Sequence, residues 1–245
     1  MRNQNPRNVY RNFMENKIPE MRYDGTEDLT TWQHRTRAKL ADLLGLDTFS
    51  LCDPDFLIES QTETDEYWEI RFSFQTEVDY YAVAVLRLPK NITGKISPMI
   101  CLQGHSTGMH ISLGQPKFPG DEETINGGDR DFAVHALKNG YAPVALEQRY
   151  MGECGGNEKT GNPSCFPSFE FTDGRSAMPT LLAGRTSIGE RIWDVSRLID
   201  VLEAEFPQLD MDNVMLLIWD LLVHRLKRQT SIHQPYSATM WMYTT

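Results

Sequence analysis

The sequence predicts an α/β protein whose sheet is doubly wound and mostly parallel but opens with an antiparallel hairpin. Two adjacent segments, 67–77 and 80–89, alternate apolar and polar residues around a short polar turn, which is typical of paired antiparallel strands. Downstream, three short apolar runs alternate with two amphipathic helical segments. Because strands joined by a helix form right-handed crossovers, this order predicts parallel strands with helices on both faces.

The first helix is expected over residues 28–46, ahead of the hairpin. Thr30 or Thr31 can cap its start, and Gly45 stands where a glycine commonly ends a helix. Both segments of the hairpin are rich in aromatic and β-branched side chains, which favour strands.

The parallel part of the sheet is expected to begin with PMICLQGHSTG, residues 98–108. This short apolar run stops abruptly in glycine, histidine, serine and threonine, as a central strand does when it delivers a loop to a site. Ligands of doubly wound sheets bind at the carboxyl ends of the strands. We therefore expect a functional site at the end of this strand.

Two crossover helices and two further strands follow. Asp129 is expected to cap a helix that Gly140 closes, and a strand over 141–149 comes directly after it. A long loop rich in glycine and proline then leads to an amphipathic helix over 189–206 and a strand over 213–219.

Composition limits the partners of the chain. Its 245 residues, 40% of them hydrophobic, suit one large α/β domain. The formal net charge of −10 argues against binding nucleic acid or an anionic membrane, so a small-molecule partner is expected. The sequence has neither a run of 18 apolar residues nor an apolar leader, which predicts a cytoplasmic protein that does not span a membrane.

The four cysteines show no CxxC spacing, and scattered cysteines in a reducing compartment are usually free thiols. Cys154 and Cys165 flank a glycine-rich loop and can pair if the protein is exported. No cofactor is expected, because neither GxxxxGK[ST] nor GxGxxG occurs. Asp121, Glu122 and Glu123 form an acidic cluster in a loop, for which solvation rather than metal binding is expected.

Three segments together resemble one superfamily. They are ICLQGHSTG (100–108), ALEQRYMGECGG (145–156), and the helix RIWDVSRLIDVLE (191–203) with the strand NVMLL that follows it. They are similar to the α/β-hydrolases, and within these to bacterial esterases related to acetyl xylan esterase and dienelactone hydrolase. The resemblance covers roughly residues 28 to 217.

The resemblance implies roles for two loops. In the first, Gly104 matches the family glycine and Gln103 replaces the usual histidine, so that Gly104 and His105 become candidates for the oxyanion hole. On the alternative interpretation, the glycines serve only a tight turn and His105 and His110 are polar loop residues.

The second loop resembles the family segment Asp-x-Arg-Gly-x-Gly-x-Ser, which has a structural role. Glu147 stands for the aspartate, and Arg149 and Gly152 match the family residues. Tyr150 and Cys154 replace its glycine and serine.

The catalytic serine of this superfamily is expected in a Gly-x-Ser-x-Gly elbow after the strand 213–219. Here residues 218–222 are Ile-Trp-Asp-Leu-Leu, the next serine is Ser231, and no glycine follows Gly189. Residues 221–245 contain no acidic and three basic residues, which leaves a formal charge of −13 on residues 1–220. The tail has no clear periodicity, so a substitute triad within it is not expected.

We therefore expect residues 1–220 to be the amino-terminal part of an incomplete α/β-hydrolase domain, and residues 221–245 to be an atypical tail, for which a shifted reading frame is one explanation. The family function is hydrolysis of a small-molecule carboxylic ester, for example an acetylated carbohydrate, but this chain is expected to lack the Ser-Asp-His triad. Alternatively, the chain is a non-catalytic binding or interaction protein that self-associates through its open sheet edge, or the missing half arrives as a separate chain.

Overall fold

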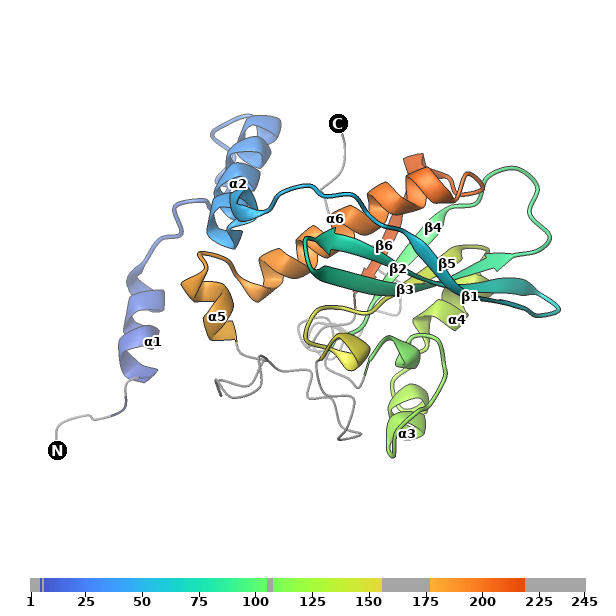
Figure 1. Cartoon of the computed structure of the whole chain (residues 1–245). Coiled ribbons are helices and arrows are strands. Elements are labelled where there is room, and N and C mark those ends of the chain that lie inside the picture. Colours follow the sequence, from blue (N-terminus) through green and yellow to red (C-terminus); the bar gives the residue numbers. More distant parts are fainter. Residues whose placement is uncertain (1–4, 6, 105–107, 156–176, 219–245) are drawn as a thin grey trace. The chain divides into compact units, whose positions relative to one another are not determined.

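The computed structural model describes residues 5, 7–104, 108–155 and 177–218. The chain divides into two compact units, Met1–Leu43 and Leu44–Thr245. The second unit contains the whole of the described sheet (Figure 1). In the described part of the chain, none of the helices has the length and apolar character that crossing a bilayer requires.

The first unit is helical. It contains α1, Arg7–Asn16, and most of α2, Leu29–Leu44, which confirms the predicted helix before the hairpin. The predicted cap of α2 is wrong: neither Thr30 nor Thr31 supplies it. The Asp28 carboxylate accepts the backbone N–H of Thr31 at 2.9 Å, because an oxygen one residue before the first turn is best placed to reach that N–H.

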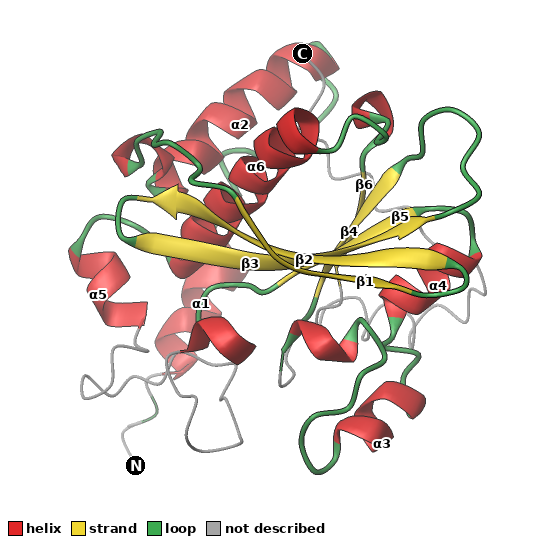
Figure 2. Ribbon diagram, turned by 45° about the vertical axis from the view of Figure 1, so that its right-hand side comes forward, coloured by secondary structure: helices red, strands yellow, loops and turns green. Residues whose placement is uncertain are grey.

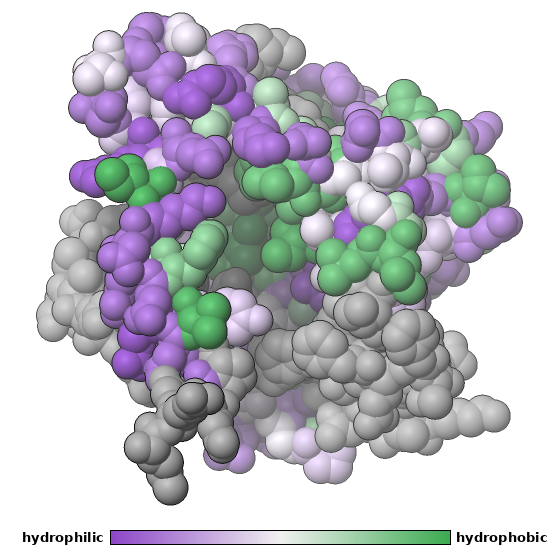
Figure 3. All heavy atoms as spheres, turned by 90° about the vertical axis from the view of Figure 1, so that its left-hand side faces the viewer, coloured by the Kyte–Doolittle hydropathy of each residue, from purple (hydrophilic) through white to green (hydrophobic). Residues whose placement is uncertain are grey.

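Helix α1 was not expected from the sequence and has no buried residue. On the face of the molecule that Figure 3 shows, hydrophobic side chains are interspersed with hydrophilic ones. The large apolar side chains exposed on α1 are Val9, Tyr10, Phe13 and Met14.

Six strands form the described sheet, in the order β1-β2-β3-β5-β4-β6 (Figure 2). Their bounds are β1 Leu57–Glu63, β2 Tyr67–Glu77, β3 Tyr80–Pro89, β4 Pro98–Leu102, β5 Ala142–Leu146 and β6 Met215–Ile218. The pairs β1–β2, β2–β3 and β3–β5 are antiparallel, whereas β4 is parallel to both β5 and β6. This confirms the predicted hairpin and the parallel strands that follow it.

Helices α4, Phe132–Lys138, and α6, Ser187–Glu205, cover the two faces of the sheet (Figure 2). The other helices of this unit are α3, Asp121–Asn126, and α5, Ala177–Leu182. Successive side chains of β5 point to opposite faces, so Val144 and Leu146 pack in one core with Leu198 of α6. Ala145 packs in a second core with Phe132 of α4. Strands that are apolar on both faces are typical of a doubly wound sheet.

Two predicted boundaries are wrong. Helix α4 begins at Phe132 with Asp131 at its N-cap position, not at Asp129. Asp129 has φ +49°, a left-handed conformation that residues other than glycine rarely adopt, and it lies three residues before the helix begins. Strand β5 ends at Leu146, three residues before its predicted end, because the chain leaves the sheet there to form the loop of the candidate site.

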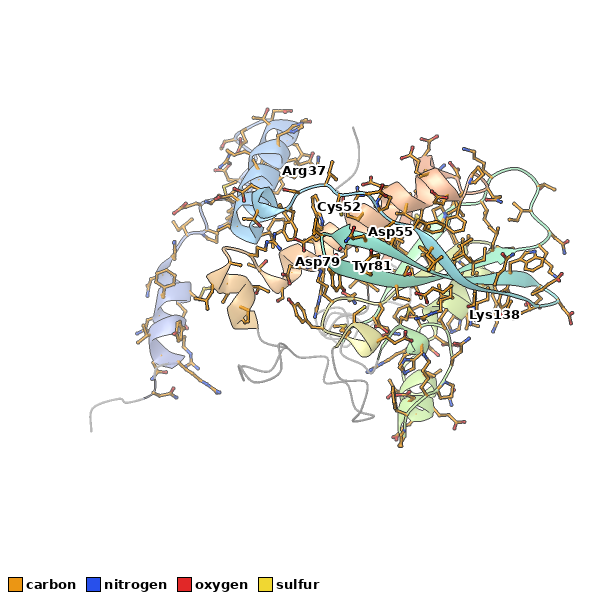
Figure 4. All side chains as sticks on the ribbon, in the orientation of Figure 1. Arg37, Cys52, Asp55, Asp79, Tyr81 and Lys138 are labelled. Atoms are coloured by element: carbon orange, nitrogen blue, oxygen red, sulfur yellow. The ribbon has the colours of Figure 1, made fainter. Side chains whose placement is uncertain are left out.

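The segment before β1 is fastened to the hairpin. The Tyr81 hydroxyl donates to the Asp55 carboxylate at 2.6 Å, and Figure 4 labels both residues. The backbone N–H of Gln75 donates to the Pro54 carbonyl at 2.6 Å, and Arg197 of α6 donates to the Cys52 carbonyl at 3.1 Å. These bonds hold the segment against β2, β3 and α6.

Candidate active site at the carboxyl ends of β4 and β5

The candidate site lies where two parallel strands end side by side. Leu102 of β4 pairs with Leu146 of β5, so the loops that follow these strands start at the same edge of the sheet. The side-chain amide of Gln148 donates to the backbone carbonyl of Gln103 and joins the two loops. Of the two oxyanion-hole candidates, Gly104 lies two residues after the end of β4, and His105 lies outside the described residues.

Gln103 has a structural role at the end of β4. Its side chain is buried, and its Nε2 donates to the Ser112 hydroxyl at 2.8 Å and to the Arg130 carbonyl at 3.2 Å. Its Oε1 is buried without a hydrogen-bond partner. The amide therefore ties the strand end to the segment that carries α4. The histidine implied by the resemblance at this position is absent.

Glu147 connects the loop after β4 with the loop after β5. Its side chain is 1% exposed, and its carboxylate accepts the backbone N–H of Met109 at 3.1 and 3.3 Å and that of Glu153 at 3.4 Å. Burial raises the pKa of the Glu147 carboxyl to about 7, against the lowering effect of the two N–H donors. Gly152, the third residue that the resemblance assigned to this segment, lies directly beside this carboxylate.

His110 and Asp121 form a buried pair. His110 Nε2 lies 2.8 Å from Asp121 Oδ2, which also accepts the backbone N–H groups of Lys117 and Phe118 at 2.9 and 2.8 Å. Burial lowers the pKa of His110, while Asp121 acts to raise it. The expected solvation of Asp121 is wrong, since Asp121 is buried, and His110 is buried with it. Eleven residues separate the two in sequence, and no local pattern links them.

Arg149 connects the loop after β5 to α6 and β2. Its guanidinium binds both carboxylate oxygens of Asp194 at 2.8 Å and Glu77 Oε2 at 2.6 Å. The next residue, Tyr150, has φ +66°, a left-handed conformation that favours glycine, and the resemblance places a glycine here. The Tyr150 hydroxyl donates to Glu190 Oε2 at 2.7 Å, which holds the strained residue against α6.

Several residues of functional interest lie outside the described part. Strand β6 ends at Ile218, so the expected elbow position and the tail 221–245 are not described. Cys165 is also outside it, and Cys154 has a free thiol. Residues 104–108, Gly-His-Ser-Thr-Gly, also have the Gly-x-Ser-x-Gly spacing of a nucleophile elbow, although they follow β4 and not β6. Among the described residues, no three His, Cys, Asp or Glu side chains gather as a metal site would require.

Comparison with known proteins identifies the fold. No family model matches the chain, and no curated protein matches its sequence. Among solved structures, it is similar to a protein from Bacteroides fragilis assigned as an acetyl xylan esterase, with a TM-score of 0.72 and 15% identity over 90% of this chain and 55% of the other. It is also similar to a methylesterase, with a TM-score of 0.51 and 17% identity over 86% and 38% of the two chains.

These likenesses confirm the predicted α/β-hydrolase-like fold. The chain spans about half the length of the Bacteroides protein and less of the methylesterase. At such low identity the likeness extends to the arrangement of strands and helices.

Proposed function

We propose that residues 1–220 are the amino-terminal part of a carboxylic ester hydrolase of the α/β-hydrolase type and that residues 221–245 are an atypical tail. The observation that supports this best is the loop after β4, which contains Gly104 two residues beyond the carboxyl end of a central parallel strand. Farther along the chain, the backbone N–H of Met109 donates to the Glu147 carboxylate. Catalytic loops of open α/β sheets lie at this edge. The likeness to esterase structures supports the same fold-level assignment.

The chemistry would follow the general route of serine esterases. A serine attacks the carbonyl carbon, a histidine takes the serine proton and returns it to the leaving alcohol, and N–H donors hold the negative charge on the former carbonyl oxygen. The backbone N–H groups of Gly104 and His105 are our candidates for these donors. A glycine lets the backbone approach the ester closely, and preorganised donors of this kind are worth several kcal/mol, on the order of 3, in the transition state.

The substrate of the complete enzyme would be a small-molecule ester, and an acetylated carbohydrate is our first choice. The net charge of −10 disfavours nucleic acid and anionic surfaces, and it fits a neutral substrate such as an acetylated sugar. The assignment of the Bacteroides protein as an acetyl xylan esterase supports the acetyl group.

By itself, the chain is proposed to be inactive, because residues 218–222 contain no serine and no glycine. The full chain should hydrolyse neither 4-nitrophenyl acetate nor acetylated xylan faster than buffer does. The matched variant is Ser106→Ala, which removes the serine at the centre of residues 104–108. Hydrolysis that this variant abolishes would contradict the proposed inactivity and assign the attack to the loop after β4.

The encoding DNA provides the sharper test of the family assignment. Downstream of the codon for Met215, one neighbouring frame should continue with Gly-x-Ser-x-Gly and later with an aspartate and a histidine. The chain that results from joining the frames should cleave a simple acetyl ester. If no frame contains these residues, the hydrolase assignment is wrong for this chain.

One observation favours the alternative of a non-catalytic interaction protein. Within the described residues, β6 pairs with β4 on one side only, and an unpaired strand edge can bind a second chain. A monodisperse dimer with a cooperative thermal transition, measured by light scattering and calorimetry, would support this alternative. A monomer would argue against it.

A further inference from the structure

Helix α1 has an apolar side that is exposed along its whole length. The side consists of Val9, Tyr10, Phe13 and Met14, whose spacing places them next to one another on the helix surface. These side chains are 59–74% exposed, and α1 contains no buried residue. The remaining residues of the helix are asparagine, arginine and glutamate. A contiguous apolar stripe on an otherwise polar, exposed helix is typical of a surface that binds a partner.

The charge of α1 is opposite to that of the rest of the chain. Arg7 and Arg11 lie one turn apart and border the apolar side next to Met14. Lys17 follows the helix, with its Nζ 5.1 Å from the centre of the Phe13 ring. Residues 1–17 contain four basic residues and one acidic residue, a formal charge of +3, which leaves −13 on residues 18–245. The partner of this helix should therefore be acidic.

Strand β1 is an acidic and partly apolar surface of the kind that α1 would bind. Among the described strands it pairs with β2 only, and all seven of its residues are exposed. Its first two side chains, Leu57 and Ile58, are 60% and 45% exposed. Residues 53–66 contain six acidic residues and no basic one. Two of the six pair with basic side chains elsewhere in the sheet region, which leaves negative charge in excess.

The area of the contact favours a second copy of the chain as the partner. The apolar side of α1 exposes about 500 Å², because each of its four side chains is roughly two-thirds exposed. A stable interface buries about 800 Å² on each partner, so one such contact is too small. If each copy contributes one helix and receives another, about 1,000 Å² is buried on each copy.

An anionic membrane fits these observations less well. Helices that bind such membranes have many lysines and arginines on the polar face, whereas α1 has three asparagines there. The charge of −13 on residues 18–245 would also be repelled by anionic lipid.

We propose that α1 is a docking helix: its apolar side binds the outer surface of β1 in a second copy of this chain, and the contact is reciprocal. Arg7 and Arg11 then lie against the acidic residues of β1, and Leu57 and Ile58 contact the apolar side. The inference concerns association only and does not depend on ester hydrolysis. The dimer also differs from one formed through the open edge of β6, since both its contacts involve α1.

The first test is sedimentation equilibrium of the full chain, whose mass should be twice 28.1 kDa. The double substitution Tyr10→Ala, Phe13→Ala should raise the dissociation constant of the dimer at least about tenfold, because it removes two central side chains of the contact. The matched control is Asn8→Ala, Asn12→Ala on the polar side of the same helix, which should leave the dissociation constant unchanged. Since α1 has no buried residue, neither variant should affect folding.

The second test exchanges the charges of the two surfaces. One variant carries Arg7→Glu and Arg11→Glu on α1, and the other carries Glu59→Lys and Glu63→Lys on β1. Each variant by itself should be monomeric, because its helix and its strand then carry charges of the same sign. An equimolar mixture should dimerise again, because each helix meets a strand of opposite charge in the other variant. Recovery in the mixture also shows that both variants are folded.

Three results would overturn the inference. A dimer that Tyr10→Ala, Phe13→Ala leaves intact is formed through another surface, such as the edge of β6. A mixture of the charge variants that stays monomeric, while the unsubstituted chain dimerises, excludes β1 as the receiving surface. An unsubstituted chain that stays monomeric excludes the dimer itself, whether or not it then sediments with phosphatidylserine vesicles.

Discussion

Replacing Asp194 with asparagine should destabilise the protein far more than the same change at Asp200, although both aspartates pair with an arginine and both lie on α6. Asp194 is 1% exposed and binds Arg149 through two 2.8 Å bonds, with a further bond from the Thr76 hydroxyl at 2.6 Å. Asp200 binds Arg197 at 2.6 Å but is 53% exposed. Burial and the number of hydrogen bonds separate the two pairs.

The expected magnitude follows from what each change leaves behind. Breaking a buried ion pair typically costs 3–5 kcal/mol, because the remaining charge is buried without its partner. In Asp194→Asn, Arg149 keeps Glu77 at 2.6 Å and the asparagine keeps one acceptor, so we expect a value near the lower end, about 3 kcal/mol. For Asp200→Asn the expected loss is below about 1 kcal/mol, as for other solvent-screened pairs.

The assay is urea unfolding at neutral pH, with both variants and the unsubstituted chain compared at equal m-values. Circular dichroism at 222 nm reports the helices that the cluster connects. If the two variants lose equal stability, the Arg149 cluster does not hold α6 to the sheet, and the reasoning from burial is wrong.

Three further predictions concern Glu147, a glycine beside it, and the cap of α6. Because the pKa of Glu147 is raised to about 7 in the folded chain, the folded state keeps a proton that the unfolded state loses above pH 4.5. The contribution of Glu147 to the free energy of unfolding should therefore fall by up to about 3 kcal/mol between pH 4.5 and 7. Urea unfolding of the unsubstituted chain and of Glu147→Gln at several pH values measures this contribution as the difference between the two. Gly152→Ala should destabilise the chain by at least about 2 kcal/mol, because the methyl group overlaps the Glu147 carboxylate, whereas Gly94→Ala, also at positive φ but with open space around it, should cost about 1 kcal/mol in the same assay. Thr186→Ala should lower stability by about 1 kcal/mol, because the Thr186 hydroxyl accepts the N–H of Gly189 at 2.9 Å, and an unchanged melting temperature would contradict that cap.

The strands and helices that the sequence predicts correctly are those whose pattern reports burial. Strand β2 alternates because only one of its faces, with Ile70, Phe72 and Phe74, packs in the core, and α6 has an apolar stripe because one side packs on the sheet. Strand β1 is not predicted from the sequence, because its residues, LIESQTE, are all exposed at the edge of the sheet and therefore need no alternation of apolar and polar side chains. Helix α3 has six residues, too few to show a helical period.

Some residues of the candidate site can likewise be predicted from the sequence, and others cannot. Gly104 and Glu147 are recognisable from the motifs that follow β4 and β5, because each motif is contiguous in sequence. The pair His110 and Asp121 has no such signal, since only the path of the chain between the turn Met109–Ile111 and α3 brings the two together. The same holds for Arg149 and Asp194, which are 45 residues apart.

The sequence by itself determined the order of strands β2 to β6 and of helices α2, α4 and α6, the antiparallel opening of the sheet and the strand ends from which a site would be built. Hydrophobic periodicity and turn residues act over a few neighbours, so a linear pattern is sufficient to specify them. Only the tertiary structure decided that Asp121 is buried, that Glu147 bonds two loops through their backbones, and that Tyr150 is held in a left-handed conformation. These properties depend on which groups lose water when distant segments meet, and that is a property of the packed chain rather than of any one segment.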